Sequence, residues 1–150
     1  MRWIHNDGVA IDISNRLEAI IAEFRATRGC TALYLYGSYG TPNQTPLSDV
    51  DLAAVFRDGE LPAHDAELDL IGRVTRAARC DDVSVAVLNR ADPIFRHRVL
   101  RTGRLLLCVD AVALADFVER TLDEHADFIV DYEAFLREYD AALVEAYSRE

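Results

Sequence analysis

The chain has 150 residues, the size of one ordinary domain with a single core, and its formal net charge is -10 with a pI of about 4.8. This charge argues against a protein that binds nucleic acid through phosphates, because such proteins carry clustered positive charge. The sequence begins with no basic segment followed by an apolar run, and it has no apolar stretch of about 18 residues, so we expect a cytoplasmic protein without membrane contact.

The first half of the chain predicts a helix and then two strands. Apolar side chains recur at steps of three and four between Ser14, a favoured helix cap, and Gly29, a favoured helix end, which indicates an amphipathic helix that packs on a sheet. A β-prone run at about 32–36 stops at a glycine, and a second run follows at about 50–56. The polar segment Thr41–Ser48 is expected to join these strands as a loop.

The middle of the chain predicts another helix, a third strand and a short helix. The helix is expected at about 63–79 and the strand at about 82–88. The short helix begins near Pro93, because a missing N–H costs nothing in the first turn of a helix. Gly103 is expected to end that helix before a final apolar run, Leu105–Cys108.

The last forty residues predict a long helix or a pair of helices. Residues 111–150 contain neither Gly nor Pro, and their apolar residues recur at steps of four and three. We expect the first half of this segment to fold back over the sheet. For the distal half, Tyr132–Tyr147, the hypothesis is a partner surface, because aromatic side chains are common anchors of interfaces.

A glycine-serine turn followed by two alternating carboxylates points to chemistry. Gly37 lets the backbone approach a phosphate closely, and Ser38 offers an anion its hydroxyl and, if it opens a helix, free N–H groups. Asp49 and Asp51 lie two residues apart, so on a strand both carboxylates face one way and suit Mg²⁺. Either half alone is typical of a turn or a solvated strand edge, but the two together after an apolar strand indicate a metal-nucleotide site.

The sequence around this turn resembles the nucleotidyltransferase superfamily. The resemblance is carried by Gly37–Gly40 and Leu47–Leu52, and the short chain is similar to the minimal members of the superfamily, the MntA-type antitoxins. Leu88–Pro93 and Val99–Leu106 resemble the segment with which these small proteins close their core. The final helical stretch is also similar, so the resemblance covers nearly the whole chain.

The resemblance implies both a fold and an activity. The fold is of the α/β (α+β) class, a single domain over residues 1–150 with a small mixed β-sheet flanked by helices and a C-terminal helical extension over about 111–150. The implied activity is transfer of AMP from Mg²⁺-bound ATP to a tyrosine of a HEPN-domain ribonuclease toxin of the HepT type, within a hetero-oligomer. The site residues are Gly37 and Ser38 for the nucleotide, and Asp49 and Asp51 for the metal and for catalysis.

The chain departs from the family at the third carboxylate, where it has Ser84. In two-metal transfer this carboxylate helps to hold the ion that activates the attacking oxygen, so its loss should impair chemistry more than nucleotide binding. Asp82 lies two residues earlier on the same face of the strand and is the candidate to replace it, against the simpler interpretation of a polar strand entry. Arg96 or Arg98 is a candidate to assist, whereas His97 between them is more typical of a solvated helix face.

The sequence leaves more than one function open. In the first, Asp49, Asp51 and Asp82 are catalytic and the protein is an AMP-transferring antitoxin. In the second, Ser84 marks eroded catalysis, and the protein neutralises its toxin by binding alone. Nucleotidylation of a small molecule such as an aminoglycoside is the weaker alternative, because those enzymes generally need extra structure to hold the sugar and 150 residues leave little room.

Overall fold

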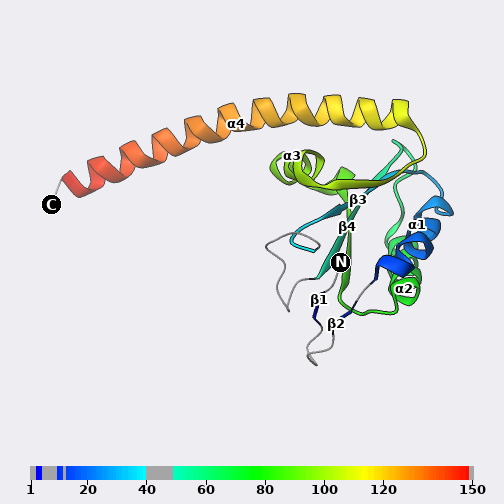
Figure 1. Cartoon of the computed structure of the whole chain (residues 1–150). Helices are drawn as coiled ribbons and strands as arrows, with labels where there is room; N and C mark the ends of the chain where they lie inside the picture. The colour runs from blue at the N-terminus through cyan, green and yellow to red at the C-terminus, as the bar shows by residue number, and fades with distance from the viewer. Residues whose placement is uncertain (1–2, 5–9, 12, 40–48, 149–150) are drawn as a thin grey trace.

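Four strands form the sheet at the centre of this computed structural model, which describes residues 3–4, 10–11, 13–39 and 49–148 (Figure 1). The strand order is β5, β4, β3, β6. The expected mixed sheet is confirmed, because β3 pairs antiparallel with both β4 and β6, whereas β4 and β5 run parallel. The strands are β3 (Cys30–Tyr36), β4 (Val50–Phe56), β5 (Val83–Val87) and β6 (Arg104–Cys108).

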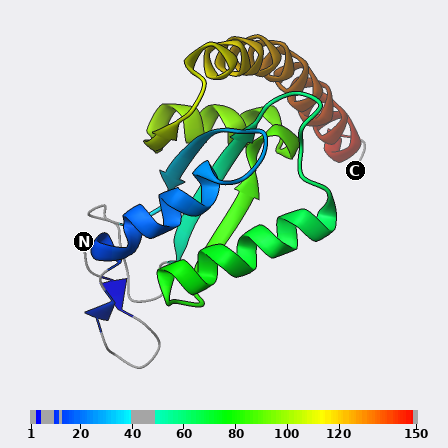
Figure 2. The same cartoon turned by 90° about the vertical axis from the view of Figure 1, so that its right-hand side faces the viewer.

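Helices cover both faces of the sheet, and the two central strands are therefore buried on both sides (Figure 2). Within β3 and β4 the partly exposed residues are Tyr36 and Asp51. One face packs against α1 (Leu17–Arg25) and α2 (His64–Ala78), and the other against α3 (Pro93–Thr102) and α4 (Ala111–Ser148). The first face buries Phe24, Leu33, Leu52 and Leu70, and the second buries Tyr34, Val55, Val99 and Phe117.

The first helix differs at both ends from the sequence prediction. A 3₁₀ turn, η1 (Ser14–Arg16), comes before α1, and the cap position of α1 is taken by Arg16. Ser14 therefore does not cap the α-helix, because the tighter turn shifts its start by three residues. The helix ends at Arg25, and Gly29 lies beyond it with a φ of +81°, where it turns the chain into β3.

The last two helices lie on the same face of the sheet. The carboxylate of Asp92 accepts a hydrogen bond of 2.9 Å from the Phe95 N–H and caps α3, with Pro93 in the first turn as the sequence predicted. Gly103 follows the helix, also as predicted. The alternative of a helical pair is wrong, because α4 is one continuous helix of 38 residues. Figure 1 shows its first part lying over α3 and its red end running out past the sheet.

Short elements lie at the edges of this architecture. β1 (Trp3–Ile4) pairs antiparallel with β2 (Ala10–Ile11), and η2 (Leu88–Arg90) follows β5; the sequence analysis expected none of these three. The loop expected over Thr41–Ser48 falls outside the described residues. In the part of the chain that the structure describes, we find no helix with the length and apolar character of a membrane span.

Candidate active site

The turn after β3 lies against the start of β4. Because these strands are antiparallel with Tyr36 opposite Asp51, the next residue, Gly37, lies beside the Asp51 carboxylate. Gly37 adopts a φ of +79°, a left-handed conformation that favours glycine, and a Cβ at this position would collide with Oδ2 of Asp51. The left-handed backbone and the nearby carboxylate both favour glycine here, at the position where sequence analysis expected a close approach to phosphate.

Asp51 is held from its other side by the neighbouring strand. In the parallel pairing of β4 with β5, Asp51 is opposite Ser84, whose hydroxyl donates a hydrogen bond of 2.7 Å to Oδ1 of Asp51. With Oδ1 engaged in this way, Oδ2 lies toward the Gly37 turn. Ser84, where the family resemblance led us to expect a third carboxylate, thus bonds directly to Asp51.

Asp49 precedes β4 and is exposed at its entry. Burial raises the pKa of the Asp51 carboxyl above its ordinary value, the Ser84 hydrogen bond lowers it in part, and the charge of Asp49 raises it further. A shared cation relieves such repulsion between two carboxylates, and their hard oxygens fit Mg²⁺, which usually keeps water and phosphate as its other ligands. Within the described ranges, no three His, Cys, Asp or Glu side chains gather closely enough to hold a metal ion.

Ser38 follows Gly37 in a bend of the chain and is half-buried. Tyr39, the next residue, is buried in a turn. The segment that would place free N–H groups at the site if it opened a helix continues into residues 40–48, which lie outside the described part of the chain. The structure therefore places Ser38 beside Gly37, at the same end of the sheet as Asp51.

Asp82 lies directly before β5, and its carbonyl accepts a hydrogen bond of 2.9 Å from the Val50 N–H. This bond places Asp82 at the entry to the β4–β5 pair. It lies two residues before Ser84, which is the residue opposite Asp51. Burial raises the pKa of the Cys80 thiol, and the charges of Asp82 and Asp81 raise it further. A backbone hydrogen bond from Asp82 lowers the same pKa in part, and Ser84 is the β5 residue that bonds to Asp51.

Tyr36 belongs to this group of residues, although the sequence analysis counted it only as part of an apolar strand. Its side chain is half-buried, burial followed by the charge of Asp51 raises its pKa, and hydrogen bonding from Ser84 lowers that pKa in part. Strand register places Tyr36, Asp51 and Ser84 side by side on three strands, and the alternation of side chains along β3 is the signal that could have revealed it.

The arginines of α3 have different roles. The guanidinium of Arg96 bonds to the Ala91 carbonyl at 2.7 Å and to Glu124 of α4 at 2.6 Å, so it joins α3 to α4 instead of facing the site. Arg98 lies 5.4 Å from the centre of the Phe95 ring, which in turn meets Tyr36 edge-on at 5.4 Å. The charge of Arg98 also lowers the pKa of Tyr36 in part, so Arg98 is the arginine on the side of the site.

His97 lies between these arginines and stacks on His125 of α4, with the ring centres 3.8 Å apart. This contact differs from the solvated helix face that the sequence favoured. Desolvation, the charge of His125 and the charge of Arg101 lower the pKa of His97. His97 therefore contributes to the packing of α3 on α4.

A cavity of about 490 Å³ lies elsewhere, between the end of α1 and the start of α2. It is lined by Thr27, Glu60, Asp69 and Arg73, among others. Arg73 is already paired with Asp69 at 3.0 Å and with Glu23 of α1 at 2.8 Å. The polar groups of this cavity serve the packing of α1 on α2, and the cavity lies on the opposite face of the sheet from Asp51.

Residues 18–111 match the family described as Polymerase beta, Nucleotidyltransferase. A chain from a mutant of the toxin-antitoxin MntA-HpeT has a TM-score of 0.67 at 20% identity, covering 82% of this chain and 97% of its own length. A chain from a tri-AMPylated Shewanella oneidensis HEPN toxin in complex with MNT antitoxin has a TM-score of 0.57 at 20% identity, covering 90% and 98%. A chain from a toxin-antitoxin with AMP-PNP has a TM-score of 0.57 at 21% identity, covering 87% and 97%. No curated protein matches the chain.

Proposed function

The chain belongs to the polymerase beta nucleotidyltransferase family, and from this premise we propose that it is an MntA-like antitoxin, which transfers AMP from ATP to a tyrosine of a HEPN-domain toxin. The proposal also draws on the fold, which the chain shares with proteins of toxin-antitoxin complexes. One of those complexes contains an AMPylated HEPN toxin, and another contains AMP-PNP.

The observation that carries the proposal is the contact between the Gly37 turn and Asp51. The turn offers backbone that a nucleotide phosphate can approach, and the Asp51 carboxylate is fixed within the same few ångströms by Ser84. Asp49 adds a second carboxylate at the same strand entry, close enough for its charge to affect Asp51. A glycine turn beside paired carboxylates suits phosphate chemistry, because backbone N–H groups bind anions and carboxylates bind the accompanying cation.

The reaction that fits this site is a substitution at phosphorus. The tyrosine oxygen of the partner forms a bond to the α-phosphorus of ATP, the bond from that phosphorus to the bridging oxygen breaks, and pyrophosphate leaves while the phenol proton passes to solvent. Gly37 and Ser38 would bind and orient the phosphates. Asp49 and Asp51 would hold a Mg²⁺ ion, which neutralises phosphate charge and aligns the nucleotide when bound.

Intact-mass measurement of the partner tests this proposal. The purified protein is incubated with Mg²⁺-ATP and a HEPN-domain protein of the HepT type as its candidate partner, and we expect the HEPN protein to gain one or more AMP units. The Asp49→Ala/Asp51→Ala variant is the control and should abolish the gain. A gain that persists in the double variant would assign the transfer to other residues.

Binding without transfer is the second candidate function, and Ser84 is the observation that favours it. The residue opposite Asp51 is a hydroxyl where the family resemblance leads us to expect a carboxylate. Under this alternative the HEPN protein forms a stable complex but gains no mass. Asp82→Ala separates the cases further, since it should abolish transfer if Asp82 replaces the third carboxylate and should change nothing if transfer is already absent.

A further inference from the structure

The face of α4 that packs on the protein continues beyond the part that is covered. Leu114, Phe117 and Thr121 are buried, and they follow one another at steps of three and four. The same spacing runs on through His125 into five further residues that we call the distal seam: Phe128, Tyr132, Phe135, Tyr139 and Leu143. Such steps keep side chains on one helix face, so the distal seam extends a surface that is already used for packing.

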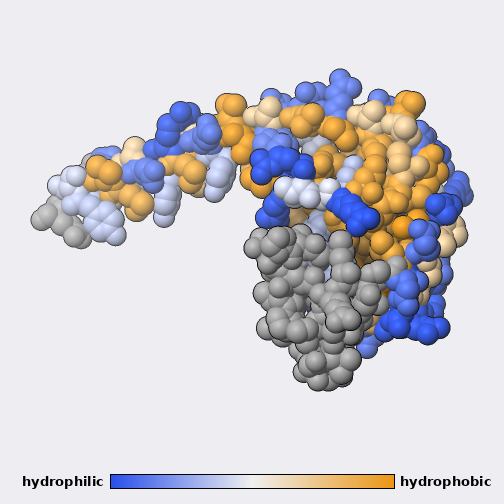
Figure 3. Space-filling view, viewed as in Figure 1, coloured by the Kyte–Doolittle hydropathy of each residue, from blue (hydrophilic) through white to orange (hydrophobic). Residues whose placement is uncertain are grey.

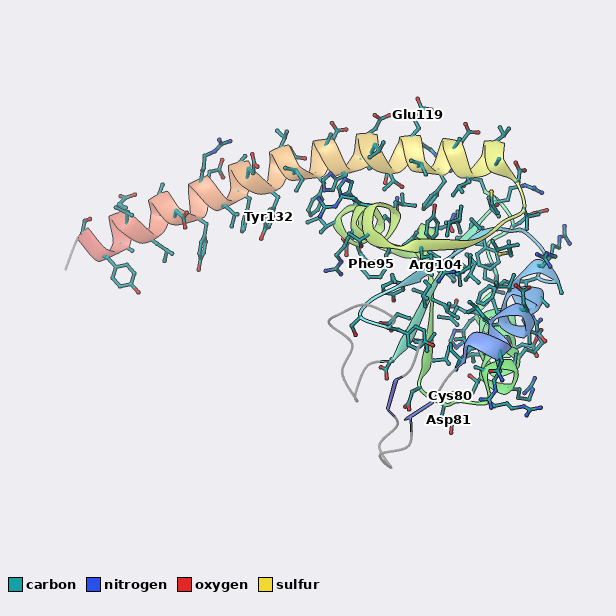
Figure 4. The ribbon with its side chains drawn as sticks, viewed as in Figure 1. Cys80, Asp81, Phe95, Arg104, Glu119 and Tyr132 are labelled. Carbon is teal, nitrogen blue, oxygen red and sulfur yellow. The ribbon has the colours of Figure 1, made fainter. Side chains whose placement is uncertain are left out.

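The distal seam is exposed. Figure 1 shows the end of α4 running clear of α3 and the sheet, and Figure 3 shows apolar and polar patches alternating along it. The side chain of Phe135 is 59% exposed, against 5% for Phe117 on the same face. Figure 4 places Tyr132 on the side of α4 toward α3, with Glu119 on the opposite side. Several large apolar side chains exposed along one helix face are typical of an interaction site.

The aromatic residues of the distal seam pack on one another. Phe128 stacks with Tyr132 at a ring separation of 6.0 Å, and Phe135 stacks with Tyr139 at 6.2 Å. The rings therefore form a ridge along the helix. Aromatic side chains are enriched among the residues that dominate binding energy, because they bury a large area with few rotatable bonds.

The charge beside the distal seam determines which occupant fits. Between residues 126 and 148 the acidic residues are Asp127, Asp131, Glu133, Glu138, Asp140 and Glu145, and the basic residue is Arg137. At about 100° per residue, Asp131 and Glu138 lie along one edge of the seam, and Glu133 and Asp140 lie along the other. Two copies of α4 packed seam to seam would oppose like charges in either orientation, which disfavours self-association. A partner with basic edges fits.

We propose that the distal seam is the docking surface for a protein partner that presents an apolar groove edged by Arg or Lys side chains. The inference rests on the proposed function, which supplies the partner, a HEPN toxin, and it adds the surface that holds this partner. α3 and α4 cover the face of the sheet that carries Asp51, as its alternation with the buried Ala53 and Val55 shows. A partner on the seam therefore meets the protein from the catalytic face of the sheet.

A pair of α4 variants of the full chain tests this docking surface. Tyr132→Ala/Phe135→Ala/Tyr139→Ala removes the ridge, while the control Val130→Ala/Val144→Ala removes exposed apolar side chains that lie off the seam. We expect titration calorimetry with the same HEPN-domain protein to show binding weakened by about 100-fold or more in the triple variant, and by about twofold at most in the control. Circular dichroism of both variants is the control and should show that they keep their helix content.

Salt dependence and oligomeric state complete the test. The association rate with the HEPN protein should fall as NaCl rises, because the complementary charges are exposed. Unchanged binding in the triple variant would overturn the inference, as would a dimer of the chain alone that the triple variant dissolves. Mass analysis separates this result from the proposed function. Seam-dependent binding without AMP transfer refutes the transfer alone, and transfer that survives loss of the seam refutes the docking surface alone.

Discussion

The strand ends around Asp51 and the distal half of α4 are both exposed in part, but they differ in how firmly neighbouring residues hold them. Asp51 is fixed by Ser84 on one side and by the Gly37 turn on the other, so its position is set before any ligand arrives. Phe135 and Tyr139 on the distal seam touch each other and project past the sheet. If the proposed function holds, the difference teaches that one region is preorganised for AMP transfer, while the other stays uncovered until a partner binds.

The largest expected effect comes from the covered half of α4. Phe117→Ala removes a ring that is 5% exposed and should lower the free energy of unfolding by about 3–5 kcal/mol. Phe135→Ala makes the same chemical change on the distal seam and should alter the free energy of unfolding by less than about 0.5 kcal/mol. Urea unfolding of both variants measures the contrast. A large loss from Phe135→Ala would mean that the seam is already covered in the free protein.

The next effect concerns the preorganised turn. Gly37→Ala forces a side chain into a left-handed conformation, which costs about 1–2 kcal/mol, and it pushes a Cβ into Oδ2 of Asp51. We expect AMP transfer to fall by about 100-fold, as a displacement of about 1 Å at a reacting group can cause.

Gly59→Ala is the matched control for this prediction, since Gly59 has a φ of +78° and no atom within 4 Å of an added Cβ. Gly59→Ala should lower the melting temperature, because its backbone is strained in the same way, and it should leave the rate of AMP transfer unchanged. If the two variants behaved alike in the transfer assay, the contact between Gly37 and Asp51 would have no role in the reaction.

A smaller effect is expected from the hydrogen bond that fixes Asp51. Ser84→Ala removes a donor at 2.7 Å from Oδ1 and should cost about 0.5–1.5 kcal/mol of stability. Transfer should fall by about 10-fold, because the carboxylate is freed to turn. Ser84→Thr keeps the hydroxyl and should retain most of the rate in the mass assay. Equal rates in the two variants would show that Ser84 does not position Asp51.

The smallest effect should appear at the stack of His97 on His125. The folded pKa of His97 is lowered from its ordinary value of 6.5, so below about that pH the folded state binds fewer protons than the unfolded state. The contribution of His97 to the stability of the folded state is present above pH 6.5 and is lost as pH falls through its folded pKa. Melting temperatures at descending pH should therefore drop slightly more in the wild type than in His97→Gln. An equal drop would remove His97 from the pH response.

The elements were predictable where local chemistry decides the structure. Pro93 and Asp92 mark the start of α3, and Gly103 marks its end, because each acts on the backbone within a single turn. The prediction that Ser14 caps the first α-helix was wrong for a related reason. A 3₁₀ turn before the α-helix leaves no trace in the apolar spacing, so the start was displaced.

The candidate site was predictable only as a set of residue types. Sequence spacing singled out Gly37, Ser38, Asp49 and Asp51, but it did not show that Asp51 touches Gly37 or that Ser84 bonds to Asp51, because both contacts depend on strand register. Tyr36 was missed, since a tyrosine in an apolar strand looks like core until its cross-strand neighbour is known. Arg96 was misassigned because its partner, Glu124, is 28 residues away and lies on another helix.

Because α4 is long, a small tilt at its base moves its tip by a large distance. At about 1.5 Å per residue, residues 126–148 reach about 35 Å from their support, so a tilt of about 10° at the base would move the tip by about 6 Å. The base is joined to α3 by the Arg96 to Glu124 ion pair and the His97 to His125 stack. Phe95 of α3 rests on Tyr36. Packed contacts therefore lead from the base of α4 through α3 to Tyr36, which lies opposite Asp51.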